Sequence, residues 1–335
     1  MLVHLRPCPP RHSILSTRFF TTTSTFQHEN PLGLPRRPPP PQMPRRAGPI
    51  VKRPVPNVKK VLAVASGKGG VGKSTIALNL AFSLALLRNP TTSSRLRVGI
   101  LDLDIFGPSI PTLMGLKNSG EPELTEGGAI LPLTNHGLPC MSMGFLLPAS
   151  ATNDNIDTPV VWRGLMVQKA VQQLLFDVDW STGGEGLDVL VIDMPPGTGD
   201  VPLTLGQLVT VDGAVIVSTP QDVALSDVRK GISMLRKVSV PITGLVLNQS
   251  YYLCPTCITP SPQYLFGKSD AFYATAERLS VPVLGELPLV AGVSTSADGG
   301  WPYVLGASKD GDGERQWKET MGKIAESVSS SLGLR

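Results

Sequence analysis

The stretch VLAVASGKGGVGKST, residues 61–75, runs from an apolar segment of strand length into a glycine-rich turn. Gly67, Gly72, Lys73 and Ser74 match the pattern of a phosphate-binding loop, which needs a strand before the turn and a helix after it. An ordinary glycine-rich turn between a strand and a helix is the alternative. The full spacing and both flanks favour the phosphate-binding interpretation, so the stretch predicts a nucleotide-binding domain.

The residue types in this loop have chemical reasons. Glycines let the backbone curl so that several N–H groups point at a polyphosphate, and the positive end of the following helix favours anions. Lys73 is expected to neutralise the β- and γ-phosphates, and the Ser74 hydroxyl to ligate Mg²⁺. The predicted nucleotide contacts are Gly67, Lys68, Gly69, Gly70, Val71, Gly72, Lys73, Ser74 and Thr75.

Apolar runs of strand length alternate with helical patterns after residue 58, and several runs are apolar on both faces. This pattern predicts an α/β fold with a doubly wound, mostly parallel sheet, whose ligands bind at the carboxyl ends of the strands. We expect surface excursions at 118–139 and 306–313. Strands are predicted at 60–65, 98–102, 138–143, 188–193, 213–218, 242–248 and 282–287. Helices are predicted at 73–88, 164–176, 203–208, 224–238, 271–278 and 314–332.

Acidic residues close two of the apolar strands. Asp193 follows four apolar residues, the Walker B arrangement, and its carboxylate is expected to hold Mg²⁺ through the water shell of the ion. The following PPGTGD segment suits a loop that senses the γ-phosphate. At the end of the other strand, Asp104 is the candidate for orienting the attacking water, with Asp102 as the alternative. The predicted catalytic residues are therefore Lys68, Lys73 and Asp104.

The charge of the chain is unevenly distributed. Of 30 Lys/Arg and 26 Asp/Glu residues, eleven and one lie within 1–60, so residues 61–335 carry a net charge of −6. The excess of basic residues lies at the amino-terminal end, so the net positive charge of the chain gives no support to nucleic-acid binding by the folded part. Residues 1–28 are rich in Arg, Ser and Thr and contain no acid before Glu29, which predicts a mitochondrial transit peptide and a matrix location. A disordered basic tail is the alternative.

The Pro- and Arg-rich stretch 29–58 is expected to be an extended linker, and 59–335 the ATPase domain. No run of eighteen apolar residues is present, so no membrane span is expected, although a peripheral association with the inner membrane stays open.

A Cys-x-x-Cys pair, Cys254 and Cys257, follows a predicted strand. Two thiols at this spacing can bind one metal centre, relay a disulfide or do neither. A zinc ion or an iron–sulfur cluster needs four soft ligands, but Cys8 lies in the predicted transit peptide and Cys140 in an apolar run, where burial is expected. A second copy of the chain can supply the two missing thiols, which predicts a homodimer.

These motifs together resemble a known family. GKGGVGKST with its extra Lys68 resembles the deviant Walker A loop of a group that includes MinD, ParA and nitrogenase iron protein. The segment Asn248–Cys257, together with DLDIFGPSIPTLMG, WRGLM, IDMPPGTGD and NPLGLPRR, resembles the Mrp/ApbC iron–sulfur carriers and their mitochondrial branch, called NUBPL. The resemblance covers residues 30–335.

The resemblance implies a MinD-like P-loop fold, binding of ATP and slow hydrolysis. It implies that Lys68 reaches the nucleotide of a partner subunit, and that Asn248 and Pro288 contact the adenine base. Cys254 and Cys257 of two subunits are expected to hold a transient [4Fe–4S] cluster. The branch is linked to delivery of such clusters for assembly of respiratory complex I, so complex I subunits are the expected acceptors.

Other functions stay open at this point. The same fold serves spatial-organiser ATPases of the MinD/ParA kind, which bind membrane or DNA. It also serves electron donors such as nitrogenase iron protein, although those space their ligating cysteines far apart. Structural zinc at the four thiolates is a further alternative. The carboxyl-terminal stretch ERQWKETMGKIAESVSSSLGLR alternates charges as an ordinary packed helix does, which argues against a membrane-binding tail.

Overall fold

The structure is a computed structural model. It describes residues 51–88, 93–105, 107–146, 164–181, 183–257, 259–307 and 311–334. The predicted transit peptide, most of the predicted linker, Cys8, Phe106 and Trp162 lie outside these residues.

Within the described residues, eight strands form one sheet in the order β3-β4-β2-β5-β1-β6-β7-β8. All neighbouring pairs are parallel except β3 and β4. The predicted doubly wound, mostly parallel α/β fold is therefore confirmed. The strands are β1 Val58–Ser66, β2 Val98–Asp102, β3 Leu133–Asn135, β4 Leu138–Ser142, β5 Leu187–Asp193, β6 Gly213–Ser218, β7 Ile242–Leu247 and β8 Val283–Glu286.

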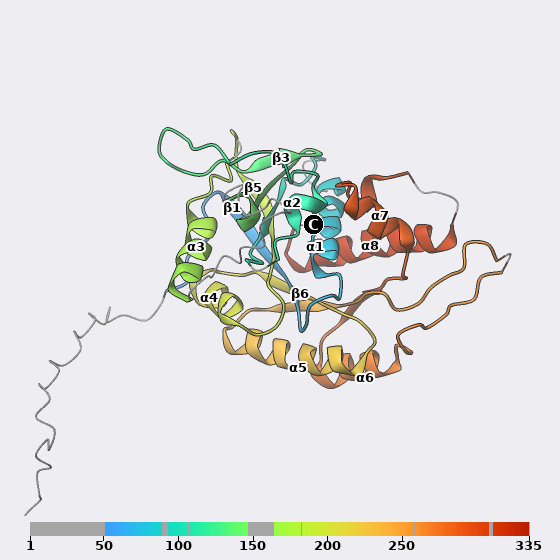
Figure 1. Ribbon diagram of the computed structural model, residues 1–335. Helices are drawn as coiled ribbons and strands as arrows, with labels where there is room; N and C mark the ends of the chain where they lie inside the picture. The colour runs from blue at the N-terminus through green and yellow to red at the C-terminus, as the bar shows by residue number, and fades with distance from the viewer. Residues whose placement is uncertain are drawn as a thin grey trace, which may run out of the picture. The chain divides into compact units, whose positions relative to one another are not determined.

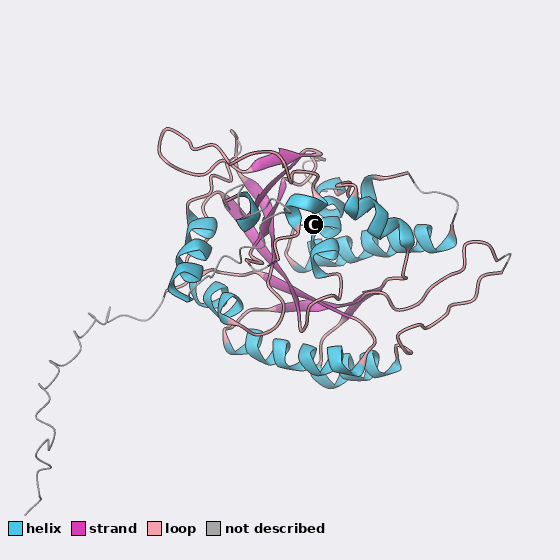
Figure 2. Ribbon diagram, viewed as in Figure 1, coloured by secondary structure: helices cyan, strands magenta, loops and turns pink. Residues whose placement is uncertain are grey.

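Helices cover both faces of the sheet (Figures 1 and 2). Helices α1, α2, α7 and α8 lie on one face, and α3 to α6 lie on the other. The helices are α1 Lys73–Leu86, α2 Ile110–Leu113, α3 Gly164–Phe176, α4 Asp200–Leu208, α5 Asp222–Lys237, α6 Asp270–Leu279, α7 Ala291–Asp298 and α8 Asp312–Ser331, with single 3-10 turns at η1 Met143–Phe145 and η3 Tyr303–Leu305.

Burial on both faces explains the continuous apolar runs. Every residue of β6 is buried, because helices pack on each side of this central strand. Helix α1 is buried nearly all round, since it lies between the sheet and α8. Helix α8 turns Trp317, Met321 and Ile324 inward, at the spacing of one helical face.

Three short elements were not predicted. Strand β3 lies within 118–139, which we expected to be a surface excursion, and pairs antiparallel with β4 at the edge of the sheet. Helix α2 has four residues and α7 has eight, among them Gly, Ser and Thr. Elements this short carry too little periodic signal to be predicted. The helical state of α2 and α7 depends on packing. Of the helices described, none has the length and apolar character needed to cross a membrane.

The carboxyl ends of the strands bring the predicted site residues to one edge of the sheet. The glycine-rich loop follows β1, Asp102 ends β2 and Asp193 ends β5. Asp102 and Asp193 face each other directly in the register of β2 and β5. Asn248 follows β7, and Pro288 lies two residues beyond β8. Parallel pairing therefore assembles residues that lie far apart in the sequence.

Candidate nucleotide site and cysteine pair

The glycine-rich loop curls over the start of α1. Gly70 and Gly72 have φ angles of 79° and 81°, a left-handed conformation that favours glycine. Gly72 is the cap residue of α1, and the helix begins at Lys73, so the free N–H groups of its first turn face the loop. This is the geometry of an anion site at a helix N-terminus.

A cavity of about 260 Å³ lies above this loop. Seven of the nine predicted contacts line it, together with Asp104, Ser109, Leu113 and Pro196. The seven are Lys68, Gly69, Gly70, Gly72, Lys73, Ser74 and Thr75. Gly67 and Val71 do not line the cavity. Gly67 packs against α5, and the Val71 side chain is buried in the core.

Lys73, which lines the cavity, forms a buried ion pair with Asp193. The Lys73 ammonium donates to Asp193 Oδ1 at 2.5 Å and to the Ser74 hydroxyl at 3.2 Å. The side chains of Lys73 and Asp193 are 6% and 0% exposed. Burial raises the pKa of Asp193, and the charge of Lys73 opposes that rise. Asp193 Oδ2 is buried and has no hydrogen-bond partner among the described residues.

Asp102 anchors the loop that leads from β2 into α2. It is fully buried, and it accepts hydrogen bonds from the backbone N–H groups of Asp104, Ser109 and Ile110 and from the Ser142 hydroxyl. Burial and the neighbouring Asp193 raise its pKa to about 7. Both carboxylate oxygens are thus committed to the protein, whereas Asp104 lines the cavity. The geometry favours Asp104 over Asp102 as the residue that meets a water in the site.

Lys68 contacts its own chain in this structure. Its ammonium donates to Gln221 Oε1 at 3.3 Å, at the start of α5. Gln221 was not predicted as a site residue, because it meets the loop through a contact across 153 positions of sequence. The predicted contact of Lys68 with a partner subunit remains a prediction.

Asn248 ties β7 to the glycine-rich loop. Its amide donates to the Val71 carbonyl at 2.9 Å, and the residue is 7% exposed. Pro288 is buried. Asn248 thus supports the loop directly, and the predicted contacts of both residues with the adenine base stay predictions.

The contact of Gly67 with α5 leads to a testable prediction. A Cβ atom at Gly67 would lie 2.5 Å from the Asp227 carbonyl carbon and 2.7 Å from the Val228 nitrogen, which are backbone atoms of α5. We expect Gly67→Ala to lower the free energy of unfolding by about 1–3 kcal/mol, the usual cost of overpacking, and to weaken nucleotide binding. Denaturant unfolding and nucleotide titration measure the two effects.

Gly69→Ala is the matched control, because a Cβ atom there meets nothing within 4 Å. Equal losses of stability in the two variants would contradict the structural role assigned to Gly67.

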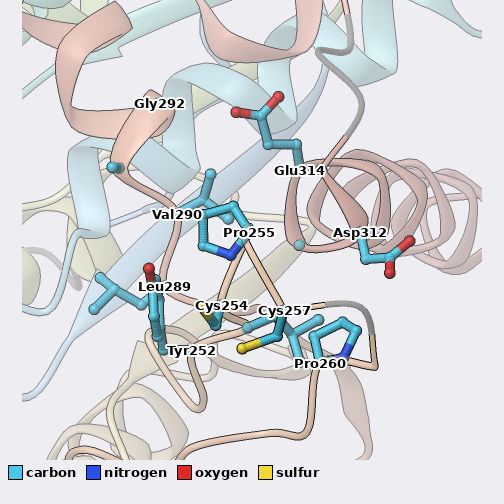
Figure 3. Close-up of a pocket in the computed structure, with 14 residues that line it drawn as sticks. Tyr252, Cys254, Pro255, Cys257, Pro260, Leu289, Val290, Gly292, Asp312 and Glu314 are labelled. Carbon is cyan, nitrogen blue, oxygen red and sulfur yellow. The ribbon is translucent and has the colours of Figure 1, made fainter.

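The cysteine pair lies on the segment between β7 and α6. Cys254 is half-buried and Cys257 is exposed. Both line a hollow of about 230 Å³, with Asp312 and Glu314 of α8 on its far side (Figure 3). The Cys254 sulfur lies 3.2 Å from the Thr256 hydroxyl. Among the described residues no three His, Cys, Asp or Glu side chains form a metal-binding group, so the pair offers two thiols.

Cys140 is fully buried in β4, as predicted, and burial raises the pKa of its thiol to about 12. It is therefore an inert core residue.

The two cysteines of the pair differ in acidity. Hydrogen bonds from Thr256 and Cys257 lower the pKa of Cys254 to about 7, and the neighbouring Cys254 raises the pKa of Cys257. Because the thiolate is the reactive form, the alkylation rate of Cys254 in the metal-free protein should rise with pH through about 7 and then level off. Mass spectrometry of iodoacetamide-treated protein across a pH series measures this profile.

Thr256→Val should move the Cys254 profile to higher pH, since it removes the hydroxyl hydrogen bond. An unchanged profile in this variant would refute the assigned cause. No sequence signal pointed to Thr256, because any residue satisfies the x positions of a Cys-x-x-Cys motif.

The fold and the loop define the class of the protein, a P-loop NTPase of the MinD/ParA type. MinD from Pyrococcus horikoshii complexed with Mg-ADP superposes with a TM-score of 0.52 at 18% identity, covering 80% of this chain and 95% of that one. A nucleotide-binding protein from Archaeoglobus fulgidus, in complex with ADP, superposes with a TM-score of 0.58 at 34% identity, covering 73% of this chain and 88% of that one.

A family model described as "ParA: NUBPL iron-transfer P-loop NTPase" matches residues 57–329, and the chain belongs to this family. The iron-sulfur cluster transfer protein NUBPL of Mus musculus is 48% identical over 254 residues, which are 76% of this chain and 73% of that protein. The Arabidopsis thaliana "Iron-sulfur protein required for NADH dehydrogenase, mitochondrial" is 45% identical, over 74% of this chain and 72% of that protein. The resemblance noted from the sequence motifs is confirmed.

Proposed function

We propose that the protein is an ATP-binding carrier of iron–sulfur clusters in the mitochondrial matrix, which delivers clusters during assembly of respiratory complex I. The observation that carries the proposal is an accessible Cys254–Cys257 pair on a P-loop NTPase of the iron-transfer family. The names of the mouse and Arabidopsis relatives support both the cargo and the acceptor.

The cargo is a [4Fe–4S] cluster held between two subunits. Such clusters are ligated by four thiolates, and one chain offers two at the accessible site. The lowered pKa of Cys254 supports ligation, because the thiolate binds the metal. A second copy of the chain, related by a twofold axis, completes the ligand set.

The nucleotide site fits ATP with Mg²⁺. Lys73 would leave Asp193 for the β- and γ-phosphates, and the ion would restore a positive partner to the buried carboxylate. The unpartnered Asp193 Oδ2 and the adjacent Ser74 hydroxyl are oxygen groups of the kind that Mg²⁺ prefers. Asp104 would orient the attacking water, and Lys68 of the partner subunit would stabilise charge on the phosphates.

ATP and cluster are coupled in this proposal through the dimer. Asn248 holds the glycine-rich loop, and the stretch of chain that carries the cysteine pair begins two residues after it. A nucleotide that binds better to one arrangement of the dimer raises the population of that arrangement. If the arrangements differ in their affinity for the cluster, nucleotide binding thereby favours either holding or releasing it.

A transfer assay tests the proposal. The protein is loaded with iron and sulfide without oxygen, mixed with an apo form of a complex I subunit, and separated from it. The acceptor should gain the absorbance and paramagnetic signals of a [4Fe–4S] cluster at a rate that depends on the carrier. Equal gain when Cys254→Ala protein replaces the wild type would overturn the proposal, because the cluster would then not travel on the cysteine pair.

A further inference from the structure

The segment that carries the cysteine pair leaves the sheet and returns to nearly the same point. We call residues 250–269 the cysteine segment; it follows β7 and ends where α6 begins. Its two terminal serines lie together, with the Ser250 and Ser269 hydroxyl oxygens 3.2 Å apart. Ser250 is 0% exposed and Ser269 is 8% exposed.

One carboxylate joins both ends. The Ser250 and Ser269 hydroxyls both donate to Glu286 Oε1, the second at 2.7 Å. The other oxygen, Oε2, accepts from the Tyr273 hydroxyl of α6 at 2.8 Å. Glu286 is the last residue of β8, so the carboxylate is held by the edge strand of the sheet.

A second pair of contacts lies further along the segment, toward the cysteines. Tyr252 and Gln263 exchange two backbone hydrogen bonds, each with an N–O distance of 2.9 Å. The Tyr251 and Tyr264 rings meet edge to face with their centroids 6.3 Å apart. The segment is thus a hairpin-like loop whose base is the serine pair and whose outer part carries Cys254 and Cys257.

We propose that Glu286 is a positioning residue for the cluster: it fastens both ends of the cysteine segment and so fixes the approach of the two thiols. The proposal rests on the proposed function. The hydrogen bonds of the Glu286 carboxylate go to Ser250, Ser269 and Tyr273, so its effect on the thiols is through the segment that carries them. Removing the carboxylate leaves two buried hydroxyls without this acceptor and loosens the base of a long loop at its Ser269 end. The Ser250 end keeps its backbone hydrogen bond to the Leu287 carbonyl. A looser base means less preorganised ligands, and hence faster loss of the cluster.

Substitutions at Glu286 separate this role from general packing. Glu286→Ala removes both acceptor oxygens. Glu286→Gln keeps Oε1 for the two serines, and its amide can donate to the Tyr273 hydroxyl, so it should rescue the wild-type behaviour. Glu277→Ala, an exposed carboxylate on neighbouring α6, is the matched control. Ser269→Ala provides a milder variant that removes one donor should Glu286→Ala fail to fold.

Two measurements are made on each variant of the full chain. Hydrogen–deuterium exchange of the metal-free protein reports the order of residues 251–268, including the bonded amides of Tyr252 and Gln263. Release of iron from the reconstituted protein to a ferrous chelator reports cluster retention. In Glu286→Ala, or in Ser269→Ala to a lesser degree, we expect faster exchange confined to this segment. Iron release from Glu286→Ala should be at least about tenfold faster, a factor within the range for leaving buried donors without their acceptor.

Rescue by Glu286→Gln and wild-type behaviour of Glu277→Ala would support the proposal. Unchanged exchange of 251–268 in both Glu286→Ala and Ser269→Ala would overturn it, and so would iron release from Glu286→Ala at the wild-type rate. If the wild type retains no iron while the exchange results hold, the carrier function fails and the fastening of the segment by Glu286 stands.

Discussion

Lys73→Ala protein is expected to lose nucleotide binding almost completely. The ammonium group is the cation that meets the phosphates, and its removal also leaves the Asp193 carboxylate buried without its ion-pair partner. Removing one member of a charge pair that is desolvated on binding, here the ammonium and the phosphates, costs about 2–5 kcal/mol, which is roughly 30-fold to several thousand-fold in the dissociation constant. Isothermal titration of ATP with Mg²⁺ measures the loss.

Two companion variants isolate the cause. Lys73→Met combined with Asp193→Asn removes both charges, so it should regain much of the stability lost in Lys73→Ala without regaining binding. Lys68→Ala should bind ATP within about threefold of the wild type and yet fail to hydrolyse it, because its proposed contact is with the partner's nucleotide. Wild-type ATP affinity in Lys73→Ala would contradict the assignment of Lys73 to the nucleotide site.

Cys254→Ala is expected to reduce the iron of the reconstituted protein from about two atoms per subunit, half of a [4Fe–4S] cluster, to almost none. The effect is large because the substitution removes two of the four thiolates of a symmetric dimer at once. Iron, sulfide and zinc analysis of protein reconstituted without oxygen measures it, and the same analysis separates an iron–sulfur cluster from structural zinc.

Cys140→Ala is the matched control, since this thiol is fully buried in β4. It should keep the iron content of the wild type and lose only some stability from the core. Full iron content in Cys254→Ala would show that the cluster is bound elsewhere.

The sequence predicted the fold and most of the residues that line the cavity above the glycine-rich loop, because both depend on local patterns. The phosphate loop has its full spacing within residues 67–74. Residues 189–192 of β5 and most of β6 are apolar runs typical of a parallel sheet that is covered on both faces. Burial of Cys140 followed from the apolar run around it, and the structure confirms it. The alternating charges of the carboxyl-terminal stretch predicted an ordinary packed helix, and α8 does pack one face into the core.

The sequence could not predict contacts that depend on the tertiary fold. Gln221 meets Lys68, and Glu286 meets Ser250 and Ser269, only after the strands have taken their places in the sheet. The sequence could not decide between Asp102 and Asp104 for the same reason. Asp102 ends strand β2 and Asp104 follows it closely, so the sequence assigns both the same position. The structure separates their roles, because four donors form hydrogen bonds with Asp102.

Two subunits share one cluster in the proposed function, and native mass spectrometry of the iron-loaded protein measures this sharing. The protein is reconstituted and sprayed without oxygen, and the masses give subunits and iron together. We expect a dimer that carries about four iron atoms per two chains, and we expect the Cys254→Ala protein to be free of metal. A monomer that retains a complete cluster would refute the sharing.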